Sequence, residues 1–231
     1  MLNLSPIAFI IPLHTLTFLA TTLFPTLIII KLKREGVFLI VMSFELYKRK
    51  AVEEFEKHKK LGKVDEDILK ELEDFNKLAD YYTTSSCSGR ILLVKNPGDA
   101  SKTPNAFYYK THQKTTPKII MEKIRKYNND YELWFKLESF ILHIGCRTLE
   151  HARKLLSLCK KVGIKRAGIN AWSKRIVVEV LGTQSIETIV VKDRKILVDE
   201  NYVKILVEKA NNRLKNTKDR IHSFFKNSKY L

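Results

Sequence analysis

The sequence predicts an α+β fold, a single domain with a mostly antiparallel sheet and flanking helices. Short apolar runs follow one another in pairs between helical segments, without the regular strand–helix alternation of a doubly wound sheet. No G-x-G-x-x-G motif follows an apolar run, so a Rossmann-type nucleotide crevice is not predicted. Strand, strand and helix occur twice in succession, which suggests a possible internal duplication.

Residues 1–41 differ in composition from the rest of the chain. Residues 6–30 contain no Lys, Arg, Asp or Glu, and a helix of this length would span a bilayer core of roughly 30 Å. Prolines and threonines interrupt the run, and basic residues follow it directly. We expect a start codon assigned upstream of Met42, so that 1–41 is an extension and 42–231 the functional domain. A genuine membrane segment is the alternative.

The segments after Met42 begin with two helical patterns, at 43–61 and 65–81, with Asp65 placed to cap the second. Hydroxyl side chains then precede the apolar run 91–94, which predicts a buried strand that ends at a turn. Residues 98–105 are expected to form an exposed loop.

The second half of the domain is predicted to alternate strands with helices. Residues 131–147 alternate and then become almost continuously apolar, as expected for one long or bent strand across the core. Thr148 is placed to cap the helix that follows. The other predicted elements are strands at 106–112, 166–171, 175–181 and 185–191, hairpin turns at 173–174 and 182–183, and helices at 117–127, 148–162 and 200–225.

Charge points to a polyanionic partner. Lys and Arg number 42 against 25 Asp and Glu, which gives a formal charge of +17, so nucleic acid is the first candidate. A lysine-rich solvated surface is the alternative. Cys87, Cys146 and Cys159 form no C-x-x-C pair, so neither a disulfide framework nor a zinc ribbon is predicted, and a cytoplasmic location suits them. No metal site is expected, because Cys87, Cys146 and His112 lack close-spaced ligand pairs.

The run from Thr83 to Arg90 is the first candidate for a site. Five hydroxyls precede a glycine, which lets a ligand approach the backbone, and an arginine suited to phosphate or carboxylate. A hydroxyl-rich strand edge with Arg90 paired to an acid is the alternative interpretation.

Residues 82–91 (YTTSSCSGRI) resemble the signature of the wybutosine-synthesising tRNA methyltransferase family. Thr111-His112, residues 136–147 (KLESFILHIGCR) and the Gly-Ile pair at 168–169 resemble further family motifs in the same order. The chain departs from the family pattern at 107–109, where a tryptophan is usual, and at Ser139, where a proline is usual. The resemblance spans about 42–225.

The resemblance implies a cytoplasmic enzyme that uses S-adenosylmethionine to methylate N4 of the demethylwyosine-type base next to the tRNA-Phe anticodon. It does not imply a Rossmann-type methyltransferase. His112 and Glu138 are candidates for the group that removes the acceptor proton, whereas His143 is interpreted as a core residue. The expected cofactor-binding residues are Ser85, Ser86, Cys87, Ser88, Gly89 and Arg90. The expected substrate-binding residues are Tyr82, Tyr108, Tyr109, Lys110 and Arg147.

Aromatic and basic side chains would by themselves be sufficient for RNA binding without catalysis. Tyr81, Tyr82, the tyrosines at 108–109 and Trp134 occur among lysines, a combination that stacks bases and holds phosphates. The last predicted helix also has a basic face for a tRNA body. A non-catalytic RNA-binding module is therefore the alternative function, and either version would be membrane-anchored only if residues 1–41 are genuine.

Overall fold

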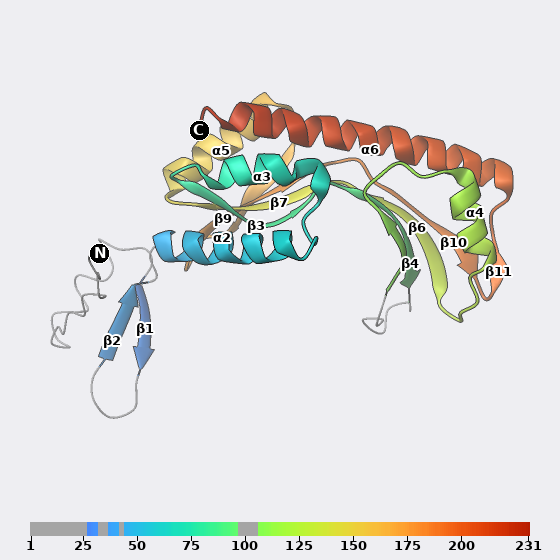
Figure 1. Cartoon of the computed structure of the whole chain (residues 1–231), viewed down its shortest axis with the longest axis horizontal. Coiled ribbons are helices and arrows are strands. Elements are labelled where there is room, and N and C mark those ends of the chain that lie inside the picture. Colours follow the sequence, from blue (N-terminus) through green and yellow to red (C-terminus); the bar gives the residue numbers. More distant parts are fainter. Residues whose placement is uncertain (1–26, 32–36, 42–43, 97–105) are drawn as a thin grey trace.

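Two antiparallel sheets lie side by side along one long helix in the computed structural model (Figure 1). The structure describes residues 27–31, 37–41, 44–96 and 106–231. The helices are α2 (Phe44–Lys60), η1 (Glu66–Ile68), α3 (Leu69–Asn76), α4 (Pro117–Arg125), α5 (Leu149–Lys161) and α6 (Glu200–Ser228). The strands are β1 (Leu27–Lys31), β2 (Val37–Val41), β3 (Tyr81–Cys87), β4 (Arg90–Asn96), β5 (Phe107–Thr111), β6 (Glu132–Glu138), β7 (Ile141–Cys146), β8 (Arg166–Ala171), β9 (Ile176–Leu181), β10 (Ile186–Lys192) and β11 (Lys195–Ile196).

The chain alternates between the two large sheets. One sheet has the order β3-β7-β9-β8 and the other the order β11-β10-β6-β4-β5, with every pairing antiparallel. The chain passes between them after β3, after β6 and after β9, so each sheet takes strands from both halves of the domain. The predicted α+β class with antiparallel sheets and flanking helices is confirmed.

Helix α6 joins the two sheets, because its 29 residues reach about 43 Å. Its first half buries Val203, Val207 and Leu214 against the five-stranded sheet. Its second half buries Ile221 and Phe224 against the four-stranded sheet. Both sheets therefore have a helix-covered face on the side of α6, where α4 completes one core and α3 and α5 the other (Figure 1).

Three predicted elements differ from the structure. The predicted strand 131–147 is two strands in different sheets, separated at Ser139 and Phe140. The predicted hairpin turn at 182–183 is a crossover between sheets, since β9 and β10 do not pair. The helix predicted at 65–81 ends with α3 at Asn76, and residues 81–87 of the hydroxyl-rich segment form strand β3. Periodicity shows which residues are buried but not which sheet buries them.

The segment predicted as N-terminal extension is described only in part. Strands β1 and β2 pair antiparallel, whereas the other residues of the candidate membrane segment and the predicted loop 98–105 lie outside the described residues. Within the described ranges, no helix is long and apolar enough to cross a membrane.

Candidate active site at the junction of the two sheets

The β3–β4 turn carries the chain from one sheet to the other directly under α6. Gly89 has φ +100°, a backbone conformation that L side chains rarely adopt. A Cβ atom at this position would lie 2.8 Å from Cγ2 of Thr217 and 3.2 Å from the carbonyl oxygen of Glu138. The glycine is therefore required both for the turn and for the close approach of α6.

Asp65 organises the turn, although the sequence predicted it to be a helix cap. Its side chain makes no capping hydrogen bond. Its Oδ2 instead accepts the backbone N–H of Ser88 at 2.7 Å and the Ser88 hydroxyl at 3.1 Å. His112 Nδ1 lies 3.2 Å from the same oxygen. The sequence contains no signal for this role, because only the fold brings the α2–α3 connection to the end of β5.

The surroundings of His112 determine which ring nitrogen carries the proton. Nδ1 lies 3.0 Å from the carbonyl oxygen of Gly89 and also faces the carboxylate of Asp65, and both groups only accept hydrogen bonds. Neutral His112 therefore carries its hydrogen on Nδ1. Nε2 keeps the lone pair and has no hydrogen-bond partner in the part of the chain that the structure describes. The Gly89 carbonyl accepts from Nδ1 and the Asp65 carboxylate lies beside it, which leaves Nε2 free as in an oriented general base.

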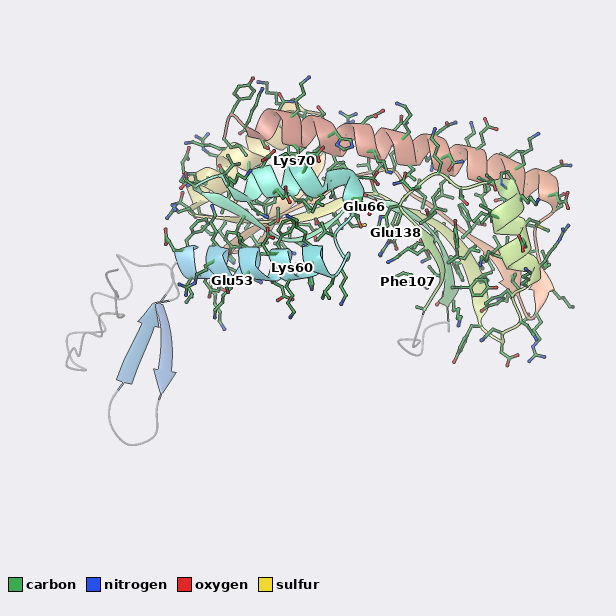
Figure 2. All side chains as sticks on the ribbon, viewed as in Figure 1. Glu53, Lys60, Glu66, Lys70, Phe107 and Glu138 are labelled. Atoms are coloured by element: carbon green, nitrogen blue, oxygen red, sulfur yellow. The ribbon has the colours of Figure 1, made fainter. Side chains whose placement is uncertain are left out.

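Arg90 and Glu138 form an ion pair across β4 and β6 at the same junction. Arg90 Nε donates to Glu138 Oε2 at 2.7 Å, and the guanidinium lies 4.9 Å from the ring centre of Phe107. Figure 2 shows Glu138 beside the junction and Phe107 on the neighbouring part of the five-stranded sheet. The pair matches the alternative interpretation that Arg90 binds an acid, and it lies in the site.

A second histidine near the junction is bonded to two side chains rather than to the core. Ser85 Oγ lies 2.7 Å from Nδ1 of His143, and Glu179 Oε2 lies 2.8 Å from Nε2. A bulge at Thr84 turns Ser85 toward His143. The interpretation of His143 as a backbone-bonded core residue is wrong, since its side chain is 25% exposed and the sheet holds a Ser–His–Glu chain.

Cys87 faces the site but is a weak nucleophile. Burial raises the pKa of its thiol, so the thiolate is disfavoured. Asp65, Cys87 and His112 have potential ligand atoms within 4.8 Å of one another. Hydrogen bonds already engage Oδ2 of Asp65 and Nδ1 of His112. Cys146 lies elsewhere, in the core of the four-stranded sheet, where burial raises its pKa to about 12.

The face of the five-stranded sheet away from α6 carries aromatic and charged rows. Residues directly opposite on antiparallel strands point to the same face. Phe107, Val94 and Trp134 form one row, and Lys110, Leu92 and Lys136 form the next. Lys136 lies 5.3 Å from the ring centre of Trp134, and Phe107 is half exposed. We call this surface the open sheet face. No described helix covers it (Figure 1).

The structure places several predicted substrate residues away from this surface. Tyr82 is 1% exposed and stacks its ring on Gly145. Tyr108 and Tyr109 pack toward the helix-covered core and bond Lys123 and Thr115.

Arg147 follows β7 at the end opposite the junction, about 20 Å away by strand length. There it binds Asp80 and Glu45 and stacks on Phe44. Its charge is paired within the protein, so Arg147 holds α2 against the four-stranded sheet rather than binding a substrate.

The hydroxyl run does not present a row of free donors. Ser88 is fully buried and donates to Asp65, and Ser85 is bonded to His143. Ser139, next to Glu138, lies 3.2 Å from the Thr217 hydroxyl of α6. A cavity of about 560 Å³ adjoins this contact and is lined in part by Ser139, Gly182 and Thr217. The size is within the range of small-molecule sites.

A family model and individual relatives all point to one family of tRNA methyltransferases. The model of the family "Methyltransferase TYW3" matches residues 46–229. A tRNA(Phe) 7-((3-amino-3-carboxypropyl)-4-demethylwyosine(37)-N(4))-methyltransferase of Thermococcus kodakarensis is 36% identical over 80% of this chain and 93% of its own length. A Pyrococcus horikoshii protein of the same description is 34% identical over 78% of this chain and 91% of its own length. The tRNA wybutosine-synthesizing protein 3 homolog of Xenopus laevis is 32% identical over 79% of this chain and 73% of its own length.

Solved structures show the same architecture. A Pyrococcus horikoshii protein superposes with a TM-score of 0.75 at 33% identity and covers 81% of this chain and 95% of that chain. An Aeropyrum pernix protein superposes with a TM-score of 0.62 at 26% identity and covers 72% of this chain and 98% of that chain. The family match extends from the first turn of α2 to just beyond the end of α6, so it includes the whole junction. This chain therefore belongs to the methyltransferase TYW3 family.

Proposed function

We propose that this chain is an S-adenosylmethionine-dependent tRNA methyltransferase of the cytoplasm. Its substrate is the 7-(3-amino-3-carboxypropyl)-4-demethylwyosine base of tRNA-Phe, and the acceptor is N4. The relatives named for this reaction match the chain over most of its length. The Asp65–His112 pair at the junction is the observation that carries the proposal, because it supplies an oriented base in the part of the chain that resembles the family signature.

In this proposal His112 removes the acceptor proton. Its Nε2 would accept the proton of the ring nitrogen, which leaves the lone pair of that nitrogen available for the methyl group that the cofactor supplies. Asp65 keeps Nδ1 protonated and stabilises the imidazolium that results. Glu138 is the second candidate base, but one of its oxygens is bonded to Arg90, so it is less available for proton transfer.

The residues at the junction fit the cofactor. S-adenosylmethionine supplies, when bound, a methyl group on a positively charged sulfur. Arg90 offers a guanidinium. A cavity of about 560 Å³ lies beside Ser139 and Thr217, next to the junction, and has room for a nucleoside, although residues 85–90 do not line it. Ser85, Ser86 and Cys87 remain proposed contacts, whereas Ser88 holds the turn in place. Positioning two reactants accounts for most of the rate gain that such a site can give.

The open sheet face is the proposed tRNA surface. Trp134 and Phe107 offer rings for unstacked anticodon-loop bases, and Lys110 offers a charge for the backbone, whereas Lys136 is paired with Glu187. The row of Lys110, Leu92 and Lys136 is followed along β4 and β6 by the Arg90–Glu138 pair, so a loop bound on these rows would bring its modified base to the junction. The binding-module alternative needs this surface alone and gives no role to the Asp65–His112 pair.

The test compares His112→Gln with the wild type in methyl transfer from labelled cofactor to tRNA-Phe bearing the demethylated base. We expect transfer by the wild type and a rate about 10²- to 10⁴-fold lower in the variant, with unchanged cofactor binding. His222→Gln is the matched control, because His222 also pairs with a carboxylate, Glu71 at 2.7 Å. Folded wild type that binds tRNA but transfers no methyl group would favour the binding module.

A further inference from the structure

The Arg90–Glu138 pair leaves unused hydrogen-bonding capacity on both partners. Arg90 donates through Nε alone, and its terminal nitrogens make no hydrogen bond to the described residues. Glu138 accepts at Oε2 alone within the same ranges. By contrast, Arg153 and Glu150 on α5 join through two bonds, at 2.7 and 2.9 Å, and use both carboxylate oxygens. The junction pair is therefore oriented but not saturated.

The surroundings hold both groups where a ligand can reach them. The Arg90 side chain is 25% exposed and Glu138 is 42% exposed. The ring of Phe107 lies against the guanidinium, and the register places the two residues directly opposite each other at the ends of β4 and β6. A cation and an anion are thus presented side by side at the edge of the open sheet face, next to the turn that holds His112.

We propose that Arg90 and Glu138 form a receptor for a zwitterionic α-amino acid group. The fork of terminal nitrogens on Arg90 matches a carboxylate, and the free oxygen of Glu138 matches an ammonium. Glu138 is then a binding residue rather than the base, in agreement with the assignment of the base to His112. The inference rests on the proposed function, which supplies the two candidates for the ligand.

Two molecules of the proposed reaction carry this chemistry. S-adenosylmethionine ends in an amino acid, and the 3-amino-3-carboxypropyl group in the relatives' substrate is also an amino acid. The pair recognises the shared zwitterion, so the experiment must separate the two sources. Charge-assisted contacts of this kind change affinity by about 10- to 100-fold each.

The first arm measures equilibrium binding without turnover. S-adenosylhomocysteine keeps the amino acid end, whereas methylthioadenosine lacks it. If the pair holds the cofactor, Arg90→Gln and Glu138→Gln weaken binding of S-adenosylhomocysteine about 10- to 100-fold and leave methylthioadenosine unaffected.

The second arm compares methyl transfer to tRNA-Phe whose demethylated base carries or lacks the aminocarboxypropyl group. If the pair holds the substrate, both variants lose about 10- to 100-fold in kcat/KM on the complete base only. Their binding of S-adenosylhomocysteine is then unchanged.

Lys192→Gln is the control for both arms, since Lys192 and Glu132 form an ion pair 3.0 Å long at the far end of the same sheet. Variants that change neither arm, with folding verified by thermal unfolding, would overturn the inference. If Arg90→Gln does not fold, Glu138→Gln decides, because it keeps the stacking of Arg90 on Phe107. Failure of the proposed function is distinct: the wild type would transfer no methyl group to either tRNA, while the binding arm would still report on the zwitterion.

Discussion

At the scale of single residues, partners rather than residue types define the site. His112 and His143 both contact a carboxylate, but they do so through opposite ring nitrogens. Asp65 and Gly89 O hold Nδ1 of His112, whereas Glu179 holds Nε2 of His143. Of these two histidines, His112 is the one with a free Nε2 lone pair among the described residues, while Nδ1 of His143 faces the Ser85 hydroxyl. The two histidines are suited to different tasks for this reason.

The two neutral histidines should be opposite tautomers. We expect Nδ1–H at His112 and Nε2–H at His143, because each carboxylate can only accept. Nitrogen chemical shifts of ¹⁵N-labelled histidines, recorded where the rings are neutral, distinguish these forms. Asp65→Asn and Glu179→Gln assign the signals, since each substitution perturbs one ring. The same tautomer at both residues would contradict the assignment of the base.

The turn at Gly89 should tolerate no side chain. Gly89→Ala places Cβ 2.8 Å from Thr217 and adds a left-handed backbone penalty, so we expect a loss of about 2–3 kcal/mol in free energy of unfolding. Gly62→Ala is the control, because Gly62 also has positive φ, +61°, but no atom lies within 4 Å. It should cost about 1 kcal/mol. Urea unfolding measures both, and equal losses would show that the contact with α6 is unimportant.

At the scale of elements, the crossovers and α6 build the junction. Three connections pass between the sheets, and α6 lies across them with Thr217 buried between its two apolar halves. Thr217 bonds Ser139 of the second crossover and contacts the Gly89 turn. Lys218, the next residue, binds Asp67 of η1 at 2.7 Å. The helix thereby ties the α2–α3 connection, and Asp65 with it, to the sheets.

The contact between α6 and η1 should contribute a pH-dependent stability. Burial favours the neutral carboxyl of Asp67, but hydrogen bonds from Lys218 and Gln113 outweigh it and lower the pKa below 3.8. A lowered folded pKa means that the stabilisation is fully present above the unfolded pKa and is lost as pH falls through the folded one.

Asp67→Asn should therefore cost about 1 kcal/mol at pH 7, and the difference from wild type should shrink below about pH 4. Urea unfolding at both pH values measures this. Asp219→Asn, which removes an exposed pair with Lys215, should cost less than about 0.5 kcal/mol. A difference for Asp67→Asn that is equal at pH 7 and pH 3 would contradict the assignment.

At the scale of the whole molecule, the chain presents two basic surfaces on opposite sides of the sheets. The open sheet face carries Lys110 and Lys136 beside exposed aromatic rings. The outer side of α6 carries Lys209, Arg213 and Lys215, without a comparable aromatic row. The net charge of +17 attracts tRNA to both, and the open sheet face adds the neighbouring rings of Phe107 and Trp134 for stacking of unpaired bases.

The salt dependence of tRNA binding should identify the surface in use. Lys110→Gln should lower the slope of log affinity against log salt by about 0.7–0.9, since it removes about one phosphate contact. Trp134→Ala should weaken binding by about 1–3 kcal/mol without changing the slope. Lys209→Gln and Lys215→Gln are the controls on α6. A slope that changes only in the α6 variants would show that tRNA binds to α6 instead of the open sheet face.

Pattern, composition and motif resemblance were sufficient to predict the fold class, most element boundaries and the family. Period-2 and period-3.6 patterns reflect local burial, so strands β4, β8 and β9 and helices α4, α5 and α6 were predicted within a few residues. Of the predicted site residues, the structure brings Gly89 and Arg90 together with His112 and Glu138, whereas Ser85 is bonded to His143.

Only the tertiary structure decided how those residues are used. Which sheet receives a strand depends on long-range pairing, so the break at Ser139 and the crossover at 182–183 left no periodic signal. Asp65 carries the sequence signature of a cap, yet its carboxylate accepts from Ser88 and faces His112, which lies 47 positions along the chain and is brought to it by the junction. Tyr82 is a residue type that often binds bases, but in this fold its side chain is buried in the core. Hydrogen-bond partners and exposure are properties of the packed chain, and local pattern does not contain them.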